Sequence, residues 1–126
     1  MPSPLVSRIV AAALLAAFAQ PIASGFAHAH AVIIESTPAA DAVVAPGDAE
    51  VTLHFNSRID HQRSRLTLIA ADGVVRPLAI VPDSAPDVVA AKMAGLGAGQ
   101  YRIRWQVLAI DGHLTRGDIP FSVKAP

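Results

Sequence analysis

The amino-acid sequence predicts an all-β fold, a single antiparallel β-sandwich. After Ala31 the segments are short and alternate apolar with polar residues, and prolines and glycines interrupt them. Such alternation is typical of strands that bury one face and expose the other, and it does not fit helices. The chain has 126 residues, and without the expected leader over 1–29 about 97 remain, which is enough for one small domain and not for two.

The expected strands follow this alternation in chain order. Segment 50–56 alternates cleanly, because Val51, Leu53 and Phe55 share one face and His54 points to the other. Asp72-Gly73 suits the positive φ angles of a type I′ turn and therefore predicts a hairpin. The strands are expected at 32–35, 50–56, 65–71, 74–81, 88–93 and 100–109, with a closing strand that contains Ile119, Phe121 and Val123.

About seven strands at this spacing are typical of an immunoglobulin-like Greek-key sandwich. Residues 96–101 resemble the tight corner in which a tyrosine hydroxyl bonds to upstream backbone. Tyr101 and Trp105 are expected in the core, because aromatic rings bury a large area in a small domain. Pro82 and Pro86 indicate a loop or a protected edge strand.

Residues 1–29 read as a helical signal peptide, which leaves residues 30–126 as the working domain. Arg8 is followed by an uncharged run over 9–19 and then by small residues. This run is shorter than the roughly 20 apolar residues that a membrane-spanning helix needs. We therefore expect export and removal of the leader.

The cleavage position decides which residue begins the exported chain. Ala27-His28-Ala29 places small residues at the −3 and −1 positions, so His30 would become the new terminus. A terminal histidine can chelate one metal ion with its α-amine and its ring Nδ1. Cleavage after Ala27 is the alternative; it would begin the chain with His-Ala-His and favour a chelate of amine and backbone.

Composition restricts the chemistry. Without the leader, nine Lys/Arg face ten Asp/Glu, so no basic surplus exists to bind nucleic acid. The absence of cysteine excludes disulfides, thiolate zinc sites and thiol nucleophiles. Apart from the thioether of Met93, only oxygen and nitrogen ligands remain, and the histidines become the informative residues.

Asp111-Gly112-His113 is the segment most suggestive of a binding site. Residues i and i+2 of an extended chain point to the same side, so the carboxylate and the imidazole can converge on one ion. An Asx-type turn with an exposed histidine is the competing interpretation. If the first strand lies beside the last strands, His30 comes next to His113. His54, on an outward strand face, and His61, in an expected loop, are interpreted as solvated surface residues.

The blocks 30–39, 51–55, 99–107, 111–113 and 121–123, in this order, resemble the CopC family of periplasmic copper-binding proteins across the whole domain. The resemblance implies a seven-stranded Greek-key fold and a Cu(II) site. Carried over to this sequence, His30 would supply the amine and Nδ1, His113 a third nitrogen and Asp111 an oxygen. It also implies a copper carrier in copper resistance or homeostasis that has no catalytic activity, with a CopD-like inner-membrane protein as partner.

This chain departs from the family pattern at three places. Several members carry a methionine-rich loop for Cu(I), whereas the domain here has only Met93, which argues against a cuprous site. Some members place a carboxylate after the second strand, where this chain has Asn56-Ser57-Arg58. The residue after the Asp-x-His histidine is often proline and here is Leu114.

An oxidative copper enzyme of the polysaccharide-monooxygenase type is the alternative function. Those enzymes also hold copper with an amino-terminal histidine on a β-sandwich. They need an open axial position and a broad surface for polysaccharide. Asp111 would occupy a coordination position here, and a domain of this size leaves little chain for such a surface.

Overall fold

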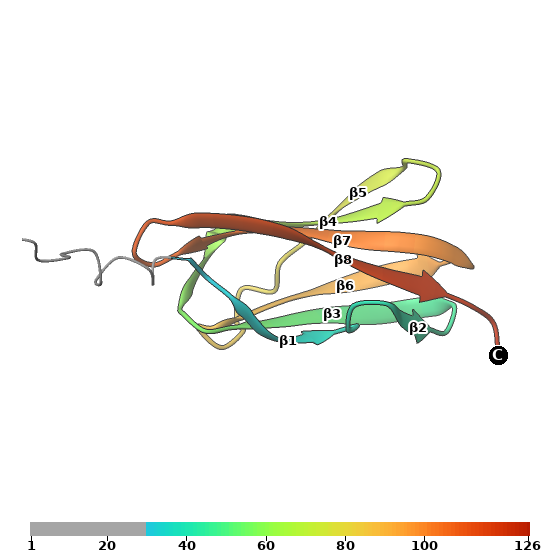
Figure 1. Ribbon diagram of the computed structural model, residues 1–126, viewed down its shortest axis with the longest axis horizontal. Coiled ribbons are helices and arrows are strands. Elements are labelled where there is room, and N and C mark those ends of the chain that lie inside the picture. Colours follow the sequence, from blue (N-terminus) through green and yellow to red (C-terminus); the bar gives the residue numbers. More distant parts are fainter. Residues whose placement is uncertain (1–29) are drawn as a thin grey trace, which may run out of the picture.

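Residues 30–126, the part of the chain that the computed structural model describes, form a two-layered β-sandwich (Figure 1). The predicted leader and its cleavage position lie outside the described residues. One sheet has the order β1-β3-β6, with β1 (Ile33–Thr37), β3 (Gly47–Phe55) and β6 (Val88–Leu96). The other has the order β2-β8-β7-β4-β5, with β2 (Ala42–Val44), β8 (Leu114–Val123), β7 (Gly99–Ala109), β4 (Ile59–Ala70) and β5 (Val75–Leu78).

The predicted all-β sandwich is confirmed, with eight strands instead of about seven. No segment of residues 30–126 forms a helix of the length and apolarity that a membrane span requires. The unpredicted strand is β2, which pairs in parallel with β8. It is held at both ends, since Asp41 N–H donates to Pro120 O at 2.7 Å and Lys124 N–H donates to Val44 O at 3.0 Å. Three residues are too few for alternation to reveal a strand.

Strand β4 begins six residues before the expected start at residue 65, so the prediction of a loop around His61 is wrong. The register between β4 and β7 shifts between Asp60 and Arg65, which marks a bulge. Inside it, Asp60 Oδ1 accepts hydrogen bonds from the N–H groups of Gln62 and Arg63. Polar and charged residues with local side-chain hydrogen bonds interrupt the alternation of apolar and polar residues here, so the hydropathy pattern does not indicate this part of the strand.

The predicted hairpin around Asp72-Gly73 is present as β4 and β5, but its turn is not type I′. A type I′ turn needs positive φ at both central residues. Only Gly73 has it, at 87°. Gly73 N–H donates to Ala70 O at 2.9 Å and Ala70 N–H donates to Val74 O at 3.0 Å, which defines a three-residue loop closed by a glycine bulge.

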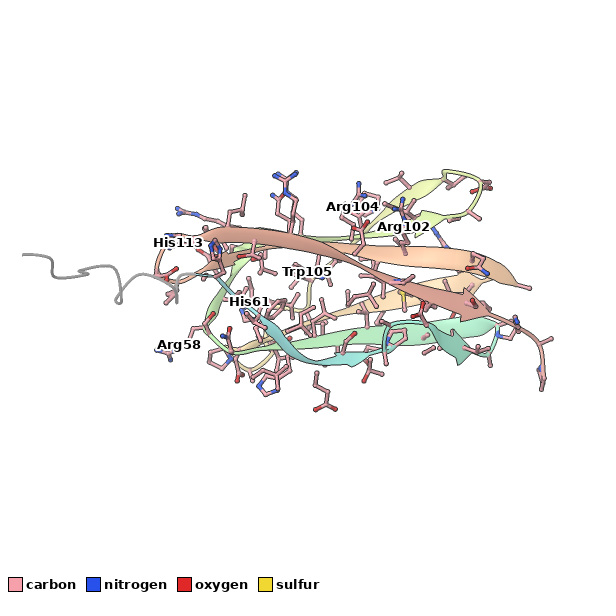
Figure 2. All side chains as sticks on the ribbon, in the orientation of Figure 1. Arg58, His61, Arg102, Arg104, Trp105 and His113 are labelled. Carbon is pink, nitrogen blue, oxygen red and sulfur yellow. The ribbon has the colours of Figure 1, made fainter. Side chains whose placement is uncertain are left out.

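The core lies between the sheets and is built from the inward residues of β3, β4, β6, β7 and β8. Trp105 lies between the two layers (Figure 2), and its ring meets Phe55 edge-on at a centroid distance of 5.4 Å. Tyr101 stacks on Phe121 and its hydroxyl donates to Gly97 O at 2.8 Å, which confirms the predicted tyrosine corner. The expected positions of Tyr101 and Trp105 against the core are confirmed.

Gly117 is required by the packing of Trp105. A Cβ at position 117 would lie 2.5 Å from the indole ring. We expect Gly117→Ala to lower the free energy of unfolding by about 1–3 kcal/mol, because the overpacked ring must move. Gly97→Ala is the control, since nothing lies within 4 Å of its Cβ position. Urea denaturation measures both, and equal stabilities would contradict this packing argument.

Candidate metal centre

The segment Asp111-Gly112-His113 forms the tight turn between β7 and β8. Gly112 N–H donates to Ala109 O at 2.8 Å, and Ala109 N–H donates to His113 O at 2.9 Å. Gly112 has a φ of 95°, which L side chains rarely adopt. The turn repeats the hydrogen bonding of residues 70–74, so the local sequence Asp-Gly fixes the backbone in both hairpins.

Within this turn Asp111 and His113 are in direct contact. Asp111 Oδ1 accepts the His113 backbone N–H at 3.1 Å and lies 3.3 Å from His113 Nδ1. The backbone hydrogen bond is the main reason that the pKa of Asp111 lies below its usual value, and the imidazole contributes further. Both side chains are about half exposed, at 50% and 52%. The Asx turn expected as the competing interpretation is therefore present.

His30 reaches this turn from the start of the other sheet. Its ring lies 6.1 Å, centroid to centroid, from the ring of His113, at an interplanar angle of 74°. The next residue, Ala31, is buried with 2% exposure and anchors the chain in the core. The structure thus brings the two predicted histidines together at one end of the sandwich.

A complete ligand cluster is not assembled in the described residues. Across residues 30–126, no three His, Cys, Asp or Glu side chains converge closely enough to hold a metal ion. Asp111 contacts His113, and His113 neighbours His30, so the three predicted site residues form a chain of two contacts.

His54 and His61 have partners of their own. His54 points outward, as predicted, but its Nε2 lies 2.8 Å from Asp87 Oδ2, so it is held by a hydrogen bond and is not simply solvated. This contact is the largest cause of the lowered pKa of Asp87. His61 is half-buried, and its Nε2 hydrogen-bonds to Val88 O. The interpretation of His61 as a solvated loop residue is wrong, because the bulge of β4 turns its ring toward β6.

The connection between β3 and β4 positions the site. Val32 N–H donates to Asn56 Oδ1 at 2.8 Å, and Asn56 N–H donates to Val32 O at 2.9 Å. Ile110 N–H donates to Arg58 O at 3.0 Å. Arg58 and His113 lie at the same end of the sandwich (Figure 2). Residues 56–58 therefore bind both the segment after His30 and the turn before His113, a role that no sequence pattern indicates.

Comparison with known proteins now decides the family. The sequence profile of the CopC domain matches residues 33–124. The chain belongs to the CopC family. A copper resistance protein C from Xanthomonas campestris pv. juglandis is 30% identical over 111 residues, which cover 82% of this chain and 87% of that protein. Protein YobA of Escherichia coli strain K12 is 28% identical over 104 residues, covering 80% of this chain and 82% of YobA.

Solved CopC-family structures share the fold. The crystal structure of CopC from Methylosinus trichosporium OB3b superposes with a TM-score of 0.69 at 22% identity, covering 76% of this chain and 95% of the other. PcoC from Escherichia coli, described as a methionine-rich copper resistance protein, gives 0.64 at 27% identity, covering 76% and 100%. The predicted sandwich fold and the predicted family are both confirmed.

The two Asp-Gly turns of this CopC-family chain provide an internal comparison. Val74 N–H donates to Asp72 Oδ1 at 3.0 Å, just as His113 N–H does to Asp111. We expect Asp72→Ala and Asp111→Ala to lower the free energy of unfolding by similar small amounts, because each removes one exposed Asx bond. Urea denaturation without metal measures this. A much larger loss for Asp111→Ala would show that it stabilises the fold beyond its turn.

Proposed function

We propose that this protein binds one cupric ion at the end of the sandwich, through His30, His113 and Asp111. The observation that supports the proposal most strongly is the 6.1 Å separation of the two imidazole rings, which come from opposite ends of the domain sequence. An imidazole nitrogen binds a first-row divalent ion at about 2.0–2.1 Å, so one ion between two rings separates their centroids by roughly 4.5–6.5 Å. The observed separation falls in that range.

The donor set favours copper among the divalent ions. Cleavage after Ala29 would add the α-amine of His30 to its ring Nδ1, a chelate that we call the histidine brace. Together with the His113 ring this gives three nitrogens, and Asp111 gives an oxygen. Cu(II) prefers tetragonal fields of nitrogen and oxygen and binds such sites more tightly than the neighbouring divalent metals. Both Asp111 contacts to His113 use Oδ1, which makes Oδ2 the oxygen better placed for an ion.

The site is proposed to serve the oxidised ion alone. Cuprous copper is bound by soft thioether and thiolate ligands. The chain has no cysteine, and its methionines are Met1 and Met93. Met93 is fully buried in the core, at 0% exposure. The scarcity of methionine in this chain differs from PcoC of Escherichia coli, which is described as methionine rich.

The cellular role that follows is a carrier or buffer of copper without catalytic activity. Curated relatives are named copper resistance proteins. The predicted leader directs the chain to the periplasm, where residues 30–126 would hold Cu(II) for copper resistance or homeostasis. Transfer to a CopD-like inner-membrane protein is the corresponding partner proposal.

Substitution of the histidines tests the site. In protein purified after export, with its first residue fixed by intact mass, His30→Ala and His113→Ala should each weaken Cu(II) binding by orders of magnitude. Each variant removes a direct ligand of the metal. Loss of a residue that only hydrogen-bonds to a ligand lowers metal affinity by about 10–100-fold, and loss of a ligand should lower it further. Competition with a chromophoric chelator gives the Kd.

His54→Ala is the matched control, because His54 is half-exposed and pairs with Asp87 away from the turn. Its Cu(II) affinity should equal that of the parent protein. If both site variants retained the parent affinity, the proposed ligands would be wrong. A protein that keeps residues ahead of His30 should lose the brace and bind more weakly, since the α-amine would then be a peptide nitrogen.

The role of Asp111 is tested by comparison with Asp72, the corresponding residue of the other Asp-Gly turn. Asp111→Asn preserves an oxygen that can accept the His113 N–H, but it replaces a charged donor with a neutral one. We expect Cu(II) binding to weaken by at least about tenfold, because a charged ligand becomes a neutral one, and we expect a changed d–d absorption band. Asp72→Asn makes the same change in the other turn and should leave both unchanged. Identical behaviour of the two variants would remove Asp111 from the site.

A further inference from the structure

The outer face of the five-stranded sheet is strongly basic. Arg102 and Arg104 project from it, away from the core (Figure 2). In this sheet the alternate residues of β4, β7 and β8 are buried, so the others point outward. The outward charged residues of these strands from Arg65 onward, which we call the arginine face, are Arg65, Arg102, Arg104, Arg116 and Asp118. Four arginines against one aspartate leave three positive charges in excess.

The register of the strands places these arginines in ordered rows. Gln106 pairs with Arg65 on one side and with Arg116 on the other. Neighbouring strands lie about 4.8 Å apart, so the backbones of the two arginines are about 10 Å apart. In the next row Arg104 pairs with Asp118. A hollow of 490 Å³ opens between these rows and is lined by Arg104, Gln106, Arg116, Gly117 and Asp118.

Asp118 shows how this face binds a carboxylate. Arg104 donates Nε to Oδ1 at 2.9 Å and Nη2 to Oδ2 at 3.1 Å, and Arg102 donates Nη1 to Oδ2 at 3.2 Å. This forked geometry is specific to arginine and a carboxylate. Arg65 and Arg116 have no ion-pair partner within residues 30–126. Two guanidinium groups thus stand exposed beside one that already holds a carboxylate.

The opposite face of the sandwich has the reverse charge. The outward charged residues of the β1-β3-β6 sheet are three acids and one base: Glu35, Asp48, Glu50 and Lys92. The domain is therefore polarised across its two layers although its total charge is near zero. Such a distribution orients an acidic partner onto one face and repels it from the other.

We propose that the arginine face docks an acidic segment of a partner protein, whose Asp and Glu carboxylates bind Arg65 and Arg116 as Asp118 binds Arg104. Gln106, between the two free arginines, adds an amide that can donate to and accept from the partner's peptide groups. Arg116 follows His113 by three residues, so the face begins about 10 Å along the backbone from His113. Docking itself requires no copper, whereas any part it plays in copper transfer rests on the proposed function.

Binding of a fluorescein-labelled hexaglutamate peptide to protein purified after export tests the proposal by fluorescence anisotropy. The parent protein should bind the peptide at low salt and lose at least about tenfold in affinity near 0.2 M NaCl, because exposed charges are then screened. Arg65→Glu with Arg116→Glu should abolish binding. Lys92→Glu with Lys124→Glu makes the same change in net charge elsewhere on the surface and should keep the affinity within about threefold of the parent.

Arg65→Gln with Arg116→Gln removes the two charges without reversing them, and it should also weaken binding of the peptide. This variant provides the test if the charge-reversed variant fails to fold. Equal losses in the arginine and lysine variants would mean that only net charge matters, and would overturn the proposal. Binding to vesicles of phosphatidylcholine and phosphatidylglycerol but not to the peptide would assign the face to a membrane. Self-association in sedimentation, removed by the arginine variants, would assign it to a second copy of this chain. The Cu(II) affinity of every arginine and lysine variant should equal that of the parent protein. A loss of peptide binding at unchanged Cu(II) affinity therefore tests the arginine face separately from the proposed copper site.

Discussion

The candidate metal site depends on the connection between β3 and β4. This segment crosses from one sheet to the other, and its backbone and side chain bind Val32 on one side and Ile110 on the other. Strand β1 and the turn after β7 belong to different sheets, and residues 56–58 hydrogen-bond to both. The separation of His30 and His113 is therefore set by a few hydrogen bonds at one end of the sandwich and by the packed core beneath them.

The first residue of this segment also acts through its side chain. The Asn56 amide oxygen accepts the Val32 N–H. An amide at this place holds the first strand and carries no charge. Segment 56–58 therefore positions the proposed ligands without being one of them, and the proposed donor set consists of one terminal residue and one tight turn.

The two layers also divide the surface chemistry. Alternation within each strand gives the core its apolar side chains and leaves the outer face of each sheet to polar ones. The charged residues among these are mainly arginines on β4, β7 and β8 and acids on β1 and β3. One small domain can therefore present a metal site at its end and two oppositely charged faces on its flanks, because the core needs only every second residue.

The sequence by itself determined the strands with regular alternation, the position of the Asp72-Gly73 hairpin but not its turn type, and the tyrosine corner, because these depend on neighbours in the chain or on a period of two. It could not show β2, which is held only by its pairing with β8, nor the first half of β4, whose bulge replaces alternation with local polar contacts. It named His30, Asp111 and His113, yet only the tertiary structure decided that the two rings lie 6.1 Å apart. The tertiary structure also decided that His54 hydrogen-bonds to Asp87 and that His61 hydrogen-bonds to Val88. Contacts between residues distant in the chain arise from the packing of two sheets, and no local pattern encodes that distance.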